Sequence, residues 1–390
     1  MRPIIQPATL VLFLSSLFLL SSSYSEKSLN KTLASSQSGN ANPKIQVAIL
    51  LDVSGSMDGL IEQAKLQLWN MVSVMGKAKC DSVTPGIEIA LYEYGRSSND
   101  ARAGYIKQIN PFSTDLDQIS KDLFALKTNG GDEYCGHVML TSLTDLNWDA
   151  SKDSYKVIFI AGNEDFLQGN VSWTRACEEA KKKGVIVNTI YCGDKMQGVK
   201  EHWNLAMECG SGSYTNINHG AVIEDIPTPY DSALFTLNTR LNGTYIGYGS
   251  AGFENKSKQE AVDVMNFNSN KAAAAKRVSV KGKKGLYSNT SWDLVDAYEA
   301  DSTIISRVDV KTLPDSLQKK SRKDLKVIVQ IKNKERGYIQ QEIEALSQKR
   351  DHFLATEKVK LASRSSDPTL ESEVEKIIKE QARRYRMVIE

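Results

Sequence analysis

Residues 45–57 place a polar turn directly after an uninterrupted apolar run, and this segment constrains the fold more than any other. The run Ile45–Leu51 is too continuous for a half-exposed strand, so it predicts a buried strand of a parallel sheet. Asp52, Ser54 and Ser56 follow it. Apolar side chains then recur at helical spacing, at Leu60, Ile61, Ala64, Leu68, Met71, Val72 and Met75. We therefore expect one carboxylate and two hydroxyls at the carboxyl end of a strand, where open α/β sheets hold their ligands.

The side chains of this turn predict a cation site. Asp52, Ser54 and Ser56 supply hard oxygen donors, which suit Mg²⁺, Mn²⁺ or Ca²⁺ better than copper or zinc. The alternative is a turn that only caps the following helix. A cap requires one polar side chain, whereas three are present here.

Strands and helices alternate as far as residue 217. The predicted strands are Ile87–Glu93, Gly104–Ile109, Tyr155–Ile160, Val185–Tyr191 and Ser213–Ile217. The predicted helices are Asp115–Leu126, Val138–Leu146, Val171–Lys183 and Lys200–Met207. This alternation predicts an α/β fold, a Rossmann-like doubly wound and mostly parallel sheet, in a domain over residues 44–222.

The hexapeptide Asp52–Met57, placed between a buried strand and a helix, resembles the metal-ion-dependent adhesion site of von Willebrand factor type A (vWA) domains. The resemblance covers roughly residues 43–220. It implies that the chain binds a protein or peptide ligand through a divalent cation. The cation keeps one coordination position open, and a carboxylate of the ligand fills it.

Two loops depart from the family pattern. The family supplies a threonine after a Gly-Gly pair, whereas Asp132 follows Gly130-Gly131 here. The family also supplies an aspartate after its fourth strand, and that position falls on or near Gly162. In one interpretation Asp132 replaces the lost carboxylate and Mg²⁺, Mn²⁺ or Ca²⁺ still binds; in the other the site is degraded. Further candidate ligands are Thr128, Glu133 and Glu164.

The N-terminus has the pattern of an exported protein. Residues 1–25 combine Arg2 with the apolar stretch Ala8–Leu20 and small residues at Ser23 and Ser25, as in a secretory signal peptide. Residues 26–43 are polar and predict a flexible leader. We expect the mature protein to be secreted, extracellular or periplasmic, without stable membrane insertion.

Export permits disulfides, and all five cysteines lie in the predicted α/β domain. We expect Cys135 and Cys192 at the carboxyl-end rim of the sheet, and they are the candidate pair. The odd number of cysteines leaves at least one free thiol.

The C-terminal part predicts helices. Residues 223–310 form a linker or helical extension, and residues 311–390 a helical region. One apolar stripe contains Ile339, Ile343, Leu346 and Phe353, and a second contains Leu370, Val374, Ile377, Ile378 and Tyr385. Such stripes predict a helical hairpin or coiled coil, through which the chain could form a homo-oligomer. Residues 271–390 carry 26 basic against 18 acidic residues, which we interpret as a solvated helix surface and not as a nucleic-acid-binding surface.

The sequence therefore favours a secreted binding protein that uses a divalent cation to hold an acidic group of a protein or peptide ligand. The alternative is a structural scaffold that has a degraded metal site and self-associates through its C-terminal helices. We do not expect an enzyme, because the nucleophile pattern G-x-S-x-G is absent around Ser54 and Ser56 and the chain has no Walker loop.

Overall fold

The computed structural model describes residues 43–81, 83–217, 226–362 and 369–389. The predicted signal peptide and almost all of the leader lie outside the described residues. Residues 42–390 form one compact unit.

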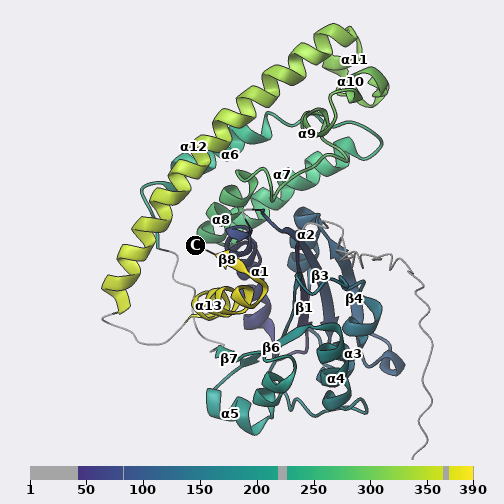
Figure 1. Ribbon diagram of the computed structural model, residues 1–390, viewed down its shortest axis with the longest axis vertical. Coiled ribbons are helices and arrows are strands. Elements are labelled where there is room, and N and C mark those ends of the chain that lie inside the picture. The colour runs from purple at the N-terminus through teal and green to yellow at the C-terminus, as the bar shows by residue number, and fades with distance from the viewer. Residues whose placement is uncertain (1–42, 82, 218–225, 363–368, 390) are drawn as a thin grey trace, which may run out of the picture. The chain divides into compact units, whose positions relative to one another are not determined.

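A six-stranded sheet lies at the centre of the α/β part (Figure 1). Its strands, in spatial order, are β4 (Lys107–Ser113), β3 (Gly86–Tyr94), β1 (Lys44–Asp52), β5 (Tyr155–Gly162), β6 (Ile186–Cys192) and β7 (Tyr214–Ile217). Every neighbouring pair is parallel except β3 and β4, which are antiparallel. The predicted mostly parallel α/β sheet is confirmed.

Helices cover both faces of the sheet because its central strands are apolar on both sides. In β1, Val47 and Ile49 face one core, whereas Ala48 and Leu50 face the other. The first core contains α1 (Asp58–Met75) and α2 (Leu116–Ala125). The second contains α3 (Cys135–Asp145) and α4 (Trp173–Lys183). This layering leaves the carboxyl ends of the parallel strands as an edge between the two helix layers.

Two predicted elements differ from the structure. The strand expected at Gly104–Ile109 begins at Lys107, because residues 101–103 form a 3-10 turn. The helix expected at Lys200–Met207 is split into α5 (Lys195–Lys200) and a 3-10 helix (Trp203–Glu208). His202 separates them with a left-handed φ of 64°, which no helix continues through.

The C-terminal region is helical, as predicted. Its α-helices are α6 (Asp231–Asn242), α7 (Gly252–Ser269), α8 (Lys271–Lys281), α9 (Leu294–Ala300), α10 (Ile304–Arg307), α11 (Asp315–Gln318), α12 (Arg322–Ala362) and α13 (Leu370–Ala382). Short 3-10 helices occur at Val310–Thr312 and Arg383–Tyr385, and two short strands, β2 (Ala78–Cys80) and β8 (Met387–Ile389), pair antiparallel. Among the described residues, no helix combines the length and the apolar content that crossing a membrane requires.

The two long helices α12 and α13 pack on different parts of the molecule. Helix α12 packs against α6, α8 and α9, and Ile339 and Ile343 of its apolar stripe are fully buried there. Helix α13 packs against α1, and Val374 and Ile378 of its stripe join the core between α1 and the sheet. Both predicted stripes are therefore buried within this chain.

A buried network of amides fixes α13 to the sheet. Gln381 exchanges two side-chain hydrogen bonds with Asn188 of β6, at 2.7 and 3.1 Å. Its carbonyl oxygen also accepts a hydrogen bond from the Tyr155 hydroxyl of β5, at 2.9 Å. All three side chains are at most 1% exposed. Because each buried polar group has a partner, α13 is held in one register on this face.

Buried ion pairs join α8 to the helices of the α/β part. The Arg277 guanidinium donates to Asp117 of α2 and Asp263 of α7, both at 2.6 Å. It also lies 4.6 Å from the centre of the Trp69 ring on α1. Removing one partner of such a buried pair typically costs about 3–5 kcal/mol.

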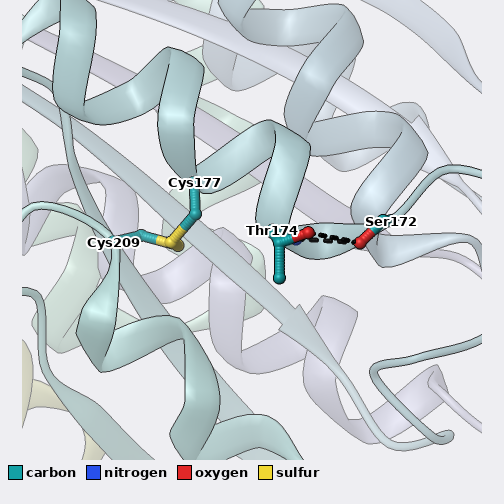
Figure 2. Close-up of a disulfide and its surroundings, with 4 residues drawn as sticks. All are labelled: Ser172, Thr174, Cys177 and Cys209. Atoms are coloured by element: carbon teal, nitrogen blue, oxygen red, sulfur yellow. Dashed lines mark hydrogen bonds between the residues drawn. A yellow bond between two sulfur atoms is a disulfide. The ribbon is translucent and has the colours of Figure 1, made fainter.

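The disulfide forms between Cys177 and Cys209, so the predicted pairing of Cys135 with Cys192 is wrong. Cys192 belongs to the core that contains α1, and Cys135 belongs to the core on the opposite face of the sheet. The sheet therefore separates the two thiols. Figure 2 shows the observed bond, which ties α4 to the segment after the 3-10 helix. The same figure shows Ser172 and Thr174 at the start of α4, where their hydroxyls lie 2.6 Å apart.

Candidate metal centre

The turn after β1 gathers the three oxygen donors predicted from the sequence. The Ser54 amide donates to Asp52 Oδ1 at 2.7 Å, which closes the turn. The hydroxyl oxygens of Ser54 and Ser56 lie 3.1 Å apart. Ser56 also donates to Asn163 Oδ1 at 3.1 Å, which connects the turn to the loop after β5. Asp52 and Ser54 are buried and Ser56 is exposed, so the cluster opens toward solvent at Ser56.

The loop that leads into α3 brings a second carboxylate to this turn. The Asn129 amide donates to the Val53 carbonyl at 2.8 Å, and the Ser97 amide donates to the Gly130 carbonyl at the same distance. These bonds fix the loop against the ends of β1 and β3. Glu133, at the end of the loop, is only 5% exposed.

Gly95 shows how closely the two acidic side chains approach the backbone. It has a φ of +78°, and a Cβ there would lie 2.7 Å from Asp52 Oδ1 and 2.8 Å from Glu133 Cγ. Only glycine fits this position. Asp52 and Glu133, called the carboxylate pair below, therefore lie together against the same face of this glycine.

The carboxylate pair is costly to ionise. Burial raises the pKa of Asp52 to about 7, although hydrogen bonds from Ser54 oppose the shift. Burial and then repulsion from Asp52 raise the pKa of Glu133 to about 8. Asp52 Oδ2 and Glu133 Oε2 are both buried without a hydrogen-bond partner. Such orphaned oxygens are rare in folded proteins, and they indicate a site that is completed by a bound group.

The remaining predicted ligands lie around the carboxylate pair. Asp132 is exposed, and its carboxylate accepts a hydrogen bond from the Tyr134 hydroxyl at 3.1 Å. Thr128 is half-buried in the same loop. Glu164 is exposed, and its negative charge contributes to the raised pKa values of Asp52 and Glu133. The structure thus brings together Asp52, Ser54, Ser56 and Glu133, whereas Asp132 is engaged by Tyr134.

Sequence reasoning missed Asn163. Its side chain contacts Ser56 from the loop directly after β5, where the vWA pattern has its aspartate. The signal was present, because Asn163 follows a continuous apolar strand in the same way that Asp52 does. The sequence pattern predicts this position on or near Gly162, and Asn163 is the next residue.

The donor set fits a hard divalent cation. Two carboxylate oxygens without partners and two hydroxyls are ligands that Mg²⁺, Mn²⁺ and Ca²⁺ accept. A cation there would compensate the mutual repulsion of the carboxylate pair. Among the described residues no group of three or more His, Cys, Asp or Glu side chains has metal-binding geometry. The cluster does not need one, since serine hydroxyls supply half of its donors.

Among the described residues, no histidine bonds to either serine of the turn. Their hydroxyls bond to each other and to Asn163. His202, in contrast, pairs with Asp165 at 3.1 Å, and His219 lies outside the described residues.

No family model matches the chain, and no curated protein matches it. Part of the chain is similar to solved structures. The VWA domain of SpRpn10 is 13% identical, with a TM-score of 0.35 over 46% of this chain and 91% of that one. Proximal thread matrix protein 1 from the mussel byssus, in a structure with a zinc-occupied MIDAS motif, is 12% identical, with a TM-score of 0.34 over 46% of this chain and 43% of that one.

A third similar structure is a von Willebrand factor type A protein from Catenulispora acidiphila. It is 14% identical, with a TM-score of 0.32 over 45% of this chain and 39% of that one. The matched part of this chain therefore spans less than half of the last two proteins. Similarities of this size carry no argument about function, and the fold class rests on the strand order and the helix layers described above.

Proposed function

We propose that this chain is an exported, non-catalytic binding protein. In this proposal Asp52, Ser54, Ser56 and Glu133 hold a divalent cation, Mg²⁺ or else Mn²⁺ or Ca²⁺. The cation supplies a positive charge with an open coordination position. A carboxylate of a protein or peptide ligand fills that position.

One observation carries the proposal: two buried carboxylates adjoin each other, and each has an oxygen without a partner. Leaving such groups unpaired costs free energy, and a fold selected only for stability would replace one of them with an amide or an apolar residue. A bound cation removes the cost. The exposed residues Gly55, Ser56 and Gly130 leave the cluster accessible to a ligand from solvent.

Export is supported by the disulfide. Disulfides persist in oxidising compartments, and Cys177–Cys209 is a buried bond of the folded domain. Together with the signal-peptide pattern of residues 1–25, it supports a secreted or periplasmic location.

Calorimetric titration of Mn²⁺ and Mg²⁺ into the full chain tests the cation site. We expect Glu133→Gln to abolish binding, because it removes one of the two charges that the cation compensates. Asp132→Asn is the matched control in the adjacent residue, and it should bind within about threefold of wild type, since Asp132 bonds to Tyr134. Equal binding by wild type and Glu133→Gln would remove the cation site from the proposal.

A peptide array tests the acidic ligand. Each Asp- or Glu-containing peptide is paired with its Asn or Gln counterpart and probed with the full chain in Mg²⁺ or in EDTA. We expect binding that requires both Mg²⁺ and the acidic member of a pair. Binding that survives EDTA would contradict the adhesive mechanism even where the cation site itself is intact.

The scaffold alternative requires a different surface. The predicted apolar stripes of α12 and α13 are buried within the chain, but Val327, Ile331 and Tyr338 of α12 are exposed. Self-association through α12 would use these side chains. Light scattering of wild type and a Val327→Ser/Ile331→Ser variant distinguishes the two proposals, because only the scaffold predicts an oligomer that the double variant disrupts.

A further inference from the structure

A groove lies over α8, between α6 and α7. Both flanking helices pack on α8, and the groove between them has a volume of about 400 Å³. Its floor includes Ala274 and Val278, and its walls include Phe235, Val264 and Phe267. The volume lies in the range of small-molecule sites, roughly 300–1,000 Å³, and the apolar walls are typical of them. This groove does not involve the candidate metal centre, and the inference below is independent of the proposed function.

At the base of the groove, beside the apolar floor, the charged side chains pair with one another. Asp263 accepts hydrogen bonds from the side chains of Asn238 at 2.9 Å and Asn242 at 2.7 Å. It also accepts from Arg277 at 2.6 Å and Lys281 at 2.8 Å. The charges of Lys281 and Arg277 hold the pKa of Asp263 well below its usual range, against the effect of burial. The strongest donors at the base are therefore used within the protein.

The polar atoms left for a ligand are acceptors. The exposed Glu260 carboxylate lines the groove and forms no ion pair with any described residue. The Thr239 hydroxyl donates to the Phe235 carbonyl at 3.2 Å, which leaves its lone pairs for an incoming donor. A groove that offers acceptors and one free carboxylate complements a donor that carries positive charge.

The aromatic wall also favours a cation. Phe235 and Phe267 form an edge-to-face pair with ring centres 5.0 Å apart. The exposed Lys271 ammonium lies 5.4 Å from the centre of the Phe267 ring, so this ring already attracts a positive charge. We propose that the groove binds a small organic cation with an apolar body, that is, an aryl or alkyl amine. The body lies between α6 and α7, and the ammonium group faces Glu260.

Fluorescence titration of the full chain with two dansyl probes tests this inference. Dansylcadaverine carries an amine, and dansylglycine has the same fluorophore with a carboxylate. We expect the cationic probe to bind at least tenfold more tightly, with a blue-shifted emission from the apolar groove. Equal affinity for the two probes, or no saturable binding of the cationic one, would overturn the proposal.

Charge variants on the two sides of the groove should act in opposite directions. Glu260→Gln removes the free carboxylate, and we expect at least fivefold weaker binding of dansylcadaverine. Lys271→Gln removes a competing cation beside Phe267, and we expect unchanged or tighter binding. Glu254→Gln, also exposed on α7 but not lining the groove, is the matched control and should bind as wild type. All three positions are exposed, so the folding of the variants is not at risk.

Equal affinity of Glu260→Gln and wild type would show that the amine does not face Glu260, and the inference would fail. Competition then identifies the source of the cation. If phenethylamine displaces the probe at a lower concentration than Nα-acetyl-lysine amide does, the groove is assigned to free amines. The opposite order assigns it to a basic side chain of a peptide, and both orders support a cation site.

Discussion

Asp52→Asn should stabilise the cation-free protein while it abolishes cation binding. Asparagine keeps an oxygen that can accept from the Ser54 amide, now 2.7 Å from Asp52 Oδ1. It also places a donor beside Glu133, whose Oε2 has no partner. What the substitution removes is the charge, and the charge is the costly part of this buried side chain.

The magnitude follows from the pKa. The pKa of Asp52 is raised from 3.8 to about 7 by burial, so the folded state holds a proton at pH values where the unfolded state has lost it. The contribution of Asp52 to wild-type stability therefore falls as pH rises from about 4 to about 7 and is constant above that range. Each pKa unit corresponds to about 1.4 kcal/mol, which sets an upper limit of about 4 kcal/mol at pH 8. Relaxation of the site reduces this limit, and we expect about 1–3 kcal/mol.

Thermal unfolding in EDTA measures the effect. At pH 8 the variant should unfold about 2–6 °C above wild type, and at pH 4 the difference should nearly vanish because wild-type Asp52 is then protonated when folded. With Mn²⁺ at one hundred times its dissociation constant, the wild type should gain about 2.7 kcal/mol and the variant nothing. A variant that is less stable than wild type in EDTA at pH 8 would refute the account of an uncompensated carboxylate.

Three further predictions concern the metal centre and the core. The apparent affinity for Mn²⁺, measured by calorimetry, should rise steeply between pH 6 and pH 9. Cation binding requires Asp52 and Glu133 to lose their protons, and their pKa values are about 7 and about 8. An affinity independent of pH would contradict this coupling between cation binding and deprotonation. A Cys177→Ser/Cys209→Ser variant should lose about 3–4 kcal/mol in urea unfolding, since the disulfide closes a loop with a sequence separation of 32 residues; reductant should then no longer destabilise it. Arg277→Ala should cost about 3–5 kcal/mol because it leaves the buried Asp117 without its cation and Asp263 with Lys281 alone, whereas Arg277→Met should cost less because it keeps packing on Trp69.

Local patterns predicted the turn that carries the site. The continuous apolar run of β1 and the helical spacing of α1 depend on neighbours in the sequence, so Asp52, Ser54 and Ser56 could be placed at the carboxyl end of a strand. The same reasoning located β5 and β6 to within one or two residues.

The choice between Asp132 and Glu133 could not be made from the sequence. Two adjacent loop residues point in different directions, and which one faces Asp52 depends on the backbone bond from Asn129 to Val53 and on the Tyr134 hydroxyl that holds Asp132. The bond from Asn129 to Val53 joins segments more than 70 residues apart in the sequence. The cysteine pairing failed for a related reason, because it required knowing on which face of the sheet each thiol lies.

The position of α13 shows why the boundaries of the helical region could not be predicted from the sequence either. The chain leaves the sheet after β7, forms α6 to α12, and returns with α13 to the face that α1 covers (Figure 1). Gln381 then accepts from the side-chain amide of Asn188, a fully buried residue of β6 whose oxygen also accepts from the Ser213 amide. A strand with a buried asparagine in its centre is costly unless a distant segment supplies matching groups.

Helix α13 is therefore part of the layer that supports the candidate metal centre. Helix α13 packs on α1, and α1 begins directly after the turn that carries Asp52, Ser54 and Ser56. Both ends of the intervening helical region are thus fixed to the α/β part, through β7 at one end and α13 at the other, while the buried Arg277 fixes its middle to α1 and α2. Residues 42–390 accordingly form one compact unit, in which the sheet and the helical region share a core.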